Sequence, residues 1–276
     1  MSAFIKWVGG KNRAMKTLLP VLLAESFECY FEPFLGGGSP FLALSTAGAI
    51  QEAVLSDVNS RLIQAWKQVQ NEPDEVLEWL SVFEEEDGAE LFEDLRDTFN
   101  TGLDSFARVR GFEAAVFIYL NRACYNGLYR ENKKGHFNAS FAGPPHRVLG
   151  KNICLEERVL AAAGALRNAV VVCEDFETII AGAGQQDLVY VDPPYHKTSQ
   201  QPYTTGDFTE DDHRRLARAL RAAVCRGSHV VVSNADTPFI RGLYQGFTAL
   251  SSSRVNSINY NIDDRASKPD LVITSF

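Results

Sequence analysis

The chain is 276 residues long, 45% hydrophobic and 22% charged, with a formal net charge of −8. This length and balance allow one sizeable core with a smaller inserted domain, and they exclude a disordered or fibrous chain. Five scattered cysteines without a Cys-x-x-Cys pair, and five dispersed histidines, indicate neither a disulfide framework nor a zinc site. No leader-like segment and no membrane-length apolar run is found, so we expect a soluble, cytoplasmic, metal-free protein.

The negative charge is concentrated in one segment. Twelve acids and one base lie between Glu72 and Asp97, a local net charge of −11, so the rest of the chain carries +3. Residues 121–151 carry a net charge of +5, and the first seventeen residues contain bases but no acid. We interpret the acidic segment as a solvated helical face, which leaves the basic regions free to meet a polyanion.

Strands and helices are expected to alternate over most of the chain. In chain order the expected elements are strand 29–31, helix 41–47, strand 54–55, helices 61–69, 74–83, 112–120 and 158–166, strands 170–173 and 188–191, helix 210–224 and strand 229–232. Apolar runs without polar alternation predict a parallel sheet covered on both faces. Strand-like runs are missing between about residues 60 and 151. We therefore predict a mainly helical domain, residues 60–151, inserted into an α/β core formed by residues 1–59 and 152–276.

A glycine-rich turn follows the first expected strand. Gly36, Gly37 and Gly38 stand between that strand and a helical pattern, where consecutive glycines let the backbone approach a ligand closely. The spacing is not the Gly-x-Gly-x-x-Gly of dinucleotide-binding proteins, and no Gly-Lys-Ser/Thr phosphate loop follows. Asp57 comes after the next expected strand, where an acid in nucleotide-binding α/β folds accepts ribose hydroxyls. Together these features indicate an adenosine-containing cofactor without a phosphate to bind.

Residues 192–195, Asp-Pro-Pro-Tyr, directly follow an expected strand, and open α/β sheets bind ligands at the carboxyl ends of their strands. An exocyclic amino nitrogen is a poor nucleophile because the ring withdraws its lone pair. The Asp192 carboxylate and the Pro193 carbonyl can accept its two N–H groups and so free that lone pair. The two prolines hold these acceptors rigidly, and Tyr195 can stack on an extruded base. The tetrapeptide therefore predicts amino methylation of a planar substrate.

Four further motifs stand in order along the chain. Residues 6–11 are similar to Lys-Trp-x-Gly-Gly-Lys, residues 31–39 contain Glu-Pro-Phe-x-Gly-x-Gly-Ser, residues 57–59 match Asp-x-Asn, and residues 121–130 match Asn-Arg-x-x-Tyr-Asn-Gly-Leu-x-Arg. With Asp-Pro-Pro-Tyr last, the chain resembles the Dam-type DNA adenine-N6 methyltransferases over nearly its whole length. The resemblance implies a Rossmann-like, mostly parallel methyltransferase core with an inserted, mainly helical target-recognition domain.

The resemblance implies S-adenosylmethionine as methyl donor, S-adenosylhomocysteine as product and no metal. Glu32 and Pro33 would lie beside the methionine moiety, and Asp175 and Phe176 at the adenine ring. The expected catalytic residues are Asp192, Pro193, Pro194 and Tyr195. The residues expected to bind the cofactor are Trp7, Lys11, Glu32, Pro33, Gly36, Gly38, Ser39, Asp57, Asp175, Phe176 and Asp192.

The resemblance also implies double-stranded DNA as the substrate, with the target adenine flipped out of the duplex. Arg130 matches an arginine that reads guanine with bidentate geometry, and Lys6 matches a lysine at the first base of the site. We expect Arg122, Lys133, Lys134 and Arg147 to position phosphates. The expected DNA contacts are thus Lys6, Arg122, Tyr125, Asn126, Arg130, Lys133, Lys134 and Arg147. One target base needs one subunit, so we expect a monomer, in a bacterium or encoded by a phage.

The chain departs from the family pattern after Asn138. Family members that methylate GATC continue with Pro-Phe-Gly and then a tyrosine beside a basic residue, whereas residues 139–147 contain no tyrosine and two prolines in sequence. The expected target is therefore GATC or a related site. Cytosine-N4 methylation uses the same amino chemistry and stays an alternative, as does a DNA-binding protein that keeps the fold without turnover.

Overall fold

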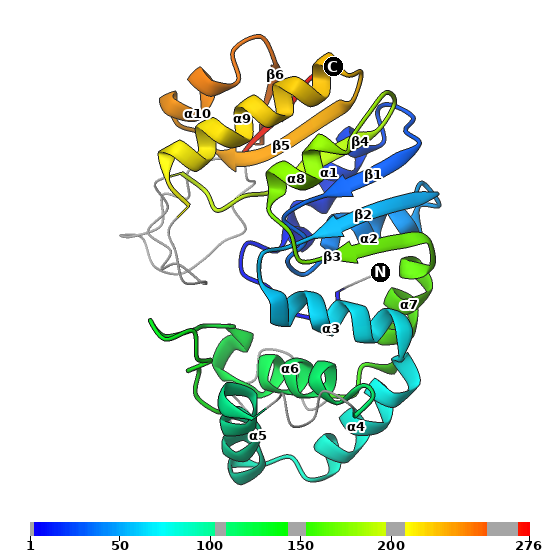
Figure 1. Ribbon diagram of the computed structural model, residues 1–276, viewed down its shortest axis with the longest axis vertical. Coiled ribbons are helices and arrows are strands. Elements are labelled where there is room, and N and C mark those ends of the chain that lie inside the picture. The colour runs from blue at the N-terminus through cyan, green and yellow to red at the C-terminus, as the bar shows by residue number, and fades with distance from the viewer. Residues whose placement is uncertain (1–2, 103–108, 143–152, 197–207, 253–269) are drawn as a thin grey trace.

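In the part of the chain that the structure describes, seven strands form one sheet. The computed structural model describes residues 3–102, 109–142, 153–196, 208–252 and 270–276. The strands are β1 (Cys29–Glu32), β2 (Glu52–Ser56), β3 (Ala169–Val172), β4 (Leu188–Val191), β5 (His229–Ala235), β6 (Thr248–Ser252) and β7 (Asp270–Thr274). Their order across the sheet is β3-β2-β1-β4-β5-β7-β6 (Figure 1).

Strands β1 to β5 all pair in parallel, which confirms the predicted α/β fold with a mostly parallel, Rossmann-like sheet. The chain builds outward from β1 to β2 and β3 and then returns to β4 on the other side of β1. Sheets of this kind bind ligands beyond the carboxyl ends of the two strands at such a reversal. Strand β7 pairs antiparallel with β5 on one side and with the edge strand β6 on the other. Neither β6 nor β7 was among the expected elements.

Successive side chains of the parallel strands enter two hydrophobic clusters on opposite faces of the sheet. In β4, Leu188 and Tyr190 belong to the first cluster, whereas Val189 and Val191 belong to the second. Both faces are therefore apolar, which explains the unbroken apolar runs in the sequence. Helices α1 (Met15–Leu22), α2 (Ser39–Thr46) and α7 (Glu156–Ala165) supply side chains to the first cluster. Helices α8 (Phe176–Ala181), α9 (Glu210–Cys225) and α10 (Pro238–Leu243) supply side chains to the second.

Helices replace strands between β2 and β3, as expected. They are α3 (Ser60–Asn71), α4 (Pro73–Glu85), α5 (Ala89–Thr101) and α6 (Phe112–Ala123), followed by α7, which packs on the sheet. Helix α3 contacts β3, α7 and α6, so it connects the sheet to the other helices, which lie below it in Figure 1. Helix α6 is buried along its length except at Glu113. The first hydrophobic cluster continues from the sheet into these helices. Helix α5 was not expected, because its many acids mask the buried stripe of Phe92, Leu95 and Phe99.

A 3-10 turn, η3 (Tyr125–Gly127), follows α6. After it comes a short antiparallel hairpin, in which Glu131 bridges Phe137. The N–H of Asn138 donates to the carbonyl of Arg130 across the hairpin at 3.0 Å. The amide of Asn100, on α5, accepts the N–H of Phe137 at 2.8 Å and donates to its carbonyl at 3.0 Å. The hairpin is therefore tied to the helices through its backbone.

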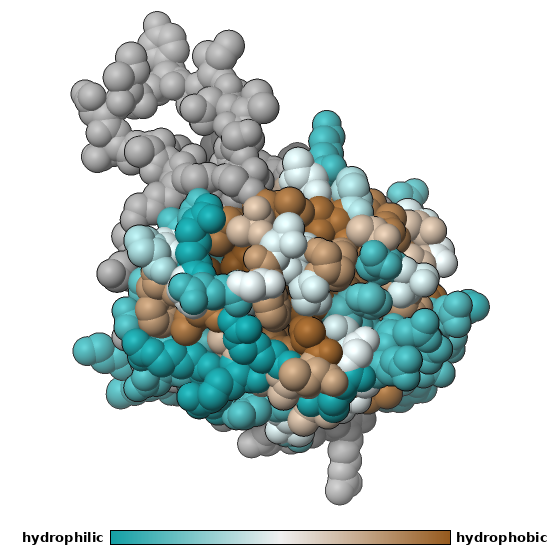
Figure 2. Space-filling model, turned by 90° about the horizontal axis from the view of Figure 1, so that it is seen from above, coloured by the Kyte–Doolittle hydropathy of each residue, from teal (hydrophilic) through white to brown (hydrophobic). Residues whose placement is uncertain are grey.

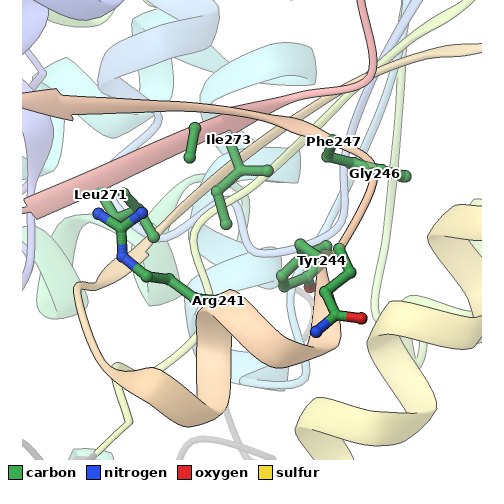
Figure 3. A pocket seen from close by; sticks show the side chains of 8 residues that line it. Arg241, Tyr244, Gly246, Phe247, Leu271 and Ile273 are labelled. Atoms are coloured by element: carbon green, nitrogen blue, oxygen red, sulfur yellow. The ribbon is translucent and has the colours of Figure 1, made fainter.

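Seen from above, the end of the molecule that carries α9, α10 and β6 shows apolar surface bordered by hydrophilic side chains (Figure 1 and Figure 2). A pocket of about 170 Å³ opens there between α10 and strands β6 and β7, with Tyr244, Phe247, Leu271 and Ile273 in its lining (Figure 3). It contains none of the residues predicted to act on a substrate.

No helix among the described residues is long and apolar enough to cross a membrane. The described side chains also include no group of three or more His, Cys, Asp or Glu placed to hold a metal ion.

Candidate active site

The reversal of strand order brings two predicted site segments together. Strand β1 leads into Glu32 and Pro33, and its neighbour β4 leads into Asp192 and Pro193. The two carboxylates are close enough that Asp192 contributes to raising the pKa of Glu32. The motif at residues 31–39 and the Asp-Pro-Pro-Tyr motif therefore meet at one edge of the sheet.

The glycine-rich turn packs against two tryptophan rings. Gly36 has a φ of +49° and Gly38, the N-cap of α2, a φ of +64°, both in the left-handed region that favours glycine. A Cβ at Gly36 would lie 2.7 Å from the Trp7 ring, and one at Gly38 would lie 2.7 Å from the Trp66 ring. The Trp66 Nε1–H donates to the Gly36 carbonyl at 3.1 Å. Only glycine fits this turn, and buried Ser39 begins the helix after it.

Asp57 fastens the same turn to β2. Its Oδ2 accepts the N–H of Gly36 at 3.0 Å, and its Oδ1 accepts the N–H of Asn59 at 3.0 Å. Burial raises the pKa of the Asp57 carboxyl, although these N–H groups oppose the shift. The carboxylate that the sequence assigned to ribose hydroxyls therefore also holds the glycine turn in place, and each oxygen keeps a second lone pair.

Glu32 is an acid inside the protein, with 1% of its surface exposed. The Tyr30 hydroxyl donates to Glu32 Oε2 at 2.9 Å. Burial raises the pKa of Glu32 well above its ordinary value, and the nearby Asp192 and Asp57 add to the shift. Pro33, the next residue, is buried as well. A buried acid with a raised pKa beside a second carboxylate is typical of a functional cleft.

Lys11 joins the amino-terminal motif to the Asp-Pro-Pro-Tyr segment. Its Nζ lies 2.5 Å from Asp192 Oδ2, and both side chains are largely buried. The same ammonium donates to the Gly9 carbonyl at 2.9 Å and lies over the ring of Tyr195, 4.8 Å from its centroid. Residues from opposite ends of the chain thus form one cluster beyond β4. Pro193 in this segment is buried, whereas Pro194 is exposed.

Trp7 lies between the glycine turn and the inserted helices. Besides contacting Gly36, its indole stacks on Tyr129 with 5.1 Å between ring centroids, and on Phe117 of α6 at 6.3 Å. A packing role and contact with a ligand at the turn are therefore compatible for this residue.

Asp175 and Phe176 follow β3, on the other side of β2 from β1. Asp175 Oδ1 caps α8 by accepting the N–H of Glu177 at 2.9 Å, and its Oδ2 pairs with Arg215 of α9 at 2.8 Å. The Arg215 guanidinium also lies 4.3 Å from the centroid of the buried Phe176 ring. Arg215 therefore holds both residues, and the sequence offered no motif that marked it.

The structure also reveals residues behind the Asp-Pro-Pro-Tyr segment that sequence reasoning missed. The Oδ1 of Asn234, at the end of β5, accepts the N–H groups of His196 at 3.2 Å and Ala235 at 2.8 Å. The His196 ring lies between Thr237, 3.0 Å from Nδ1, and Glu210, 3.2 Å from Nε2. These bonds hold the residue after Tyr195 against β5. The sequence did offer one signal for Asn234, because this polar residue stands at the end of the apolar strand β5, which pairs with the strand before the Asp-Pro-Pro-Tyr motif.

His213 on α9 lies in the same buried cluster, and we expect it to make the protein sensitive to acid. It is 1% exposed, and burial, helped by His196, lowers its pKa from 6.5 to about 4. The folded-state pKa is depressed, so the unfolded chain binds the proton more readily and stability is lost as the pH falls from 6.5 toward 4. The loss amounts to about 3 kcal/mol. Urea unfolding at several pH values should show a smaller loss for His213→Leu, and equal losses would contradict this account.

The predicted DNA-contacting residues gather around η3 and the hairpin. Lys6 Nζ donates to the carbonyl of Asn126, which has a φ of 58°, and Tyr125 is 54% exposed. Arg130 is exposed, and its guanidinium donates to the Asn138 side chain at 2.7 Å. The structure thus brings Lys6 to the motif 121–130. Lys133 and Lys134 lie exposed at the tip of the hairpin.

Arg122 does not lie where a phosphate contact requires. It is 4% exposed, and burial lowers its pKa to about 10, with Arg158 adding to the shift. A guanidinium buried at the end of α6 is not placed to contact a phosphate, so the sequence-based role for Arg122 is corrected. A charged residue at the end of a helix was read as exposed because the pattern does not reveal that α6 is central. Arg147 lies outside the described residues.

The model of the D12 class N6 adenine-specific DNA methyltransferases matches residues 7–258. The chain belongs to this family. A Type II methyltransferase, M.MjaIII, of Methanocaldococcus jannaschii is 34% identical over 95% of this chain and 94% of its own. DNA adenine methylases of Serratia marcescens and Escherichia coli K12 are each 34% identical, over 98% and 88% of this chain and 97% and 84% of their own.

Membership of the D12 class confirms the predicted enzyme and its chemistry. The protein is an adenine-specific DNA methyltransferase, so its substrate is DNA and it uses a methyl donor. This result favours adenine-N6 over cytosine-N4 methylation and catalysis over binding alone. The cluster of Lys11, Asp192 and Tyr195 lies within the matched residues.

Proposed function

We propose that this D12-class enzyme transfers the methyl group of S-adenosylmethionine to N6 of an adenine extruded from double-stranded DNA, at GATC or a related site. The observation that carries the proposal is the convergence of Lys11, Asp192 and Tyr195 beside the glycine turn. S-adenosylhomocysteine would be the product. We assign the catalytic core to residues 1–59 and 152–276, and target recognition to residues 60–151.

The glycine turn fits a nucleoside-bearing cofactor without a phosphate. Side chains are excluded from Gly36 and Gly38 by the two tryptophans, so bare backbone meets the ligand, and the Asp57 carboxylate lies directly beside it. The cofactor would supply an electrophilic methyl carbon on a sulfonium. The residues proposed to hold it are Trp7, Lys11, Glu32, Pro33, Gly36, Gly38, Ser39, Asp57, Asp175, Phe176 and Asp192.

Asp192 would accept one N–H of the target amino group, and the Pro193 carbonyl would accept the other. These bonds turn the nitrogen lone pair out of conjugation and toward the methyl carbon. The Lys11 ammonium, 2.5 Å from Asp192 Oδ2, fixes the carboxylate in position. Tyr195, whose ring lies under the same ammonium, would stack on the extruded base. As the methyl group left the sulfonium sulfur, its S–C bond would break, the N–C bond would form, and the nitrogen would lose a proton that Asp192 would accept.

We propose that η3 and the hairpin enter the major groove, with Arg130 reading guanine, Lys6 reading the first base, and Tyr125 and Asn126 beside them. Exposed Lys133 and Lys134 would neutralise phosphates. Arg147 stays in the proposed set on the sequence alone. One subunit serves one base, so we propose a monomer, acting on bacterial or phage DNA in the cytoplasm.

Transfer of a labelled methyl group tests this function. The purified protein is incubated with S-adenosylmethionine and a duplex containing one GATC, and with duplexes in which each base pair of the site is changed in turn. We expect label in the GATC or related duplex, and N6-methyladenine when the product is digested to nucleosides. N4-methylcytosine, or no label in any duplex, would overturn the proposal.

A further inference from the structure

Asn121, at the end of α6, makes two hydrogen bonds to the backbone of one distant residue. Its Oδ1 accepts the backbone N–H of Lys6 at 2.9 Å, and its Nδ2 donates to the carbonyl of the same residue at 2.9 Å. Asn121 is 0% exposed. A buried amide that satisfies both backbone groups of one distant residue clamps that residue in place.

The Lys6 side chain is held on the same surface. Its Nζ donates to the carbonyl of Asn126 in η3. Gly127 has a φ of +60°, and a Cβ there would lie 2.7 Å from Lys6 Cδ. The proposed DNA-reading turn is thus shaped around Lys6.

Residues 6–11, which we call the amino-terminal strap, continue from this clamp to the chemical site. Trp7 packs on Gly36 and Gly37 of the cofactor turn. Lys11 pairs with Asp192. The strap therefore contacts the DNA-reading turn at one end and the proposed acceptor and cofactor sites at the other.

We propose that Asn121 is a positioning residue that couples DNA reading to cofactor binding by clamping the strap. The inference rests on the proposed cofactor and DNA sites and adds a residue that touches neither ligand. Because Asn121 orders Lys6, it also restricts the neighbouring Trp7 against the glycine turn. DNA on η3 then favours the strap conformation that the cofactor needs, and by thermodynamic reciprocity the cofactor favours DNA binding equally.

Asn100 provides a matched control. Its amide makes the same two bonds to the backbone of Phe137, at 2.8 and 3.0 Å, but it anchors the hairpin and not the strap. Replacing Asn100 should weaken DNA binding without changing the cofactor site. Both asparagines belong to the inserted helices, so a general loss of stability in that region affects both variants.

The test is calorimetric titration of S-adenosylhomocysteine into wild-type, Asn121→Ala and Asn100→Ala proteins, with and without a saturating GATC duplex. We expect Asn121→Ala to raise the Kd by about tenfold and to reduce the effect of the duplex on it toward none. The KM for S-adenosylmethionine should rise by a similar factor, with kcat reduced less than threefold. The Kd for Asn100→Ala should stay within about twofold of wild-type.

An unchanged Kd in Asn121→Ala, or an equal rise in Asn100→Ala, would overturn the inference. If circular dichroism shows that the alanine variant is unfolded, Asn121→Ser and Asn100→Ser decide by the same criterion, since the serine hydroxyl leaves one hydrogen-bonding group at the buried position but cannot make the amide's pair of bonds. Failure of the wild-type protein to bind S-adenosylhomocysteine would instead overturn the proposed function, so the two failures are distinguishable.

Discussion

Replacing Asp192 with asparagine is expected to lower kcat for DNA methylation by about 10³-fold while the protein stays folded. The amide has the same shape, but it cannot balance the ammonium of Lys11, 2.5 Å away, and it carries a donor where the target amino group needs an acceptor. The measurement is methyl transfer at saturating duplex and S-adenosylmethionine, so that kcat is separated from binding.

Asp211→Asn on α9 is the matched control for this variant. That acid pairs with Arg214 at 2.7 Å, but its side chain is 91% exposed and it lies outside the Lys11 cluster. We expect it to keep wild-type kcat. A kcat for Asp192→Asn within tenfold of wild-type would show that the carboxylate does not act on the amino group.

Replacing Gly38 with alanine is expected to lower the free energy of unfolding by about 3 kcal/mol. The loss combines the strain of a left-handed backbone with the overpacking caused by the new methyl group. Gly38 has a φ of +64°, and its new Cβ would lie 2.7 Å from two ring carbons of Trp66. Trp66 is fully buried and bonded to the Gly36 carbonyl, so its ring cannot move aside without shifting the turn. The melting temperature should fall by roughly 5 to 10 °C.

Gly48→Ala separates the two causes. Gly48 also has a positive φ, +72°, but a Cβ there meets nothing within 4 Å. Its replacement should therefore cost only the backbone term, about 1 kcal/mol. The comparison is made by urea unfolding of both variants. Equal losses would mean that the Trp66 ring moves aside and that the glycine turn is more easily deformed than its packing indicates.

Much of the candidate site was predictable because its features are local in sequence. The three glycines between a strand and a helix, and the Asp-Pro-Pro-Tyr after an apolar run, specify backbone geometry within a few residues. A parallel sheet then places both at one edge, since it aligns the carboxyl ends of its strands. The same reasoning missed β6 and β7, because two short strands with antiparallel pairing at one end of the sheet leave a weak pattern.

The roles of single charged and polar residues were harder to predict from the sequence. Arg122 and Arg130 stand in one motif, yet Arg122 is 4% exposed and Arg130 is exposed. Nothing in the local pattern separates them, because their burial depends on how α6 packs among the other helices. Asn234 and Arg215 were missed for a related reason, since each acts through a partner far away in the sequence.

The amino-acid sequence by itself determined the resemblance to the family, the amino-methylation chemistry, the α/β core and the turns that carry Gly36 and Asp192. Those features depend on residue types at short spacing, and elementary stereochemistry translates them into structure. Only the tertiary structure decided that Lys11 pairs with Asp192 and that Asn121 clamps Lys6. Such contacts join residues from different parts of the chain, and their strength comes from burial, which exists only once the sheet and the inserted helices have packed together.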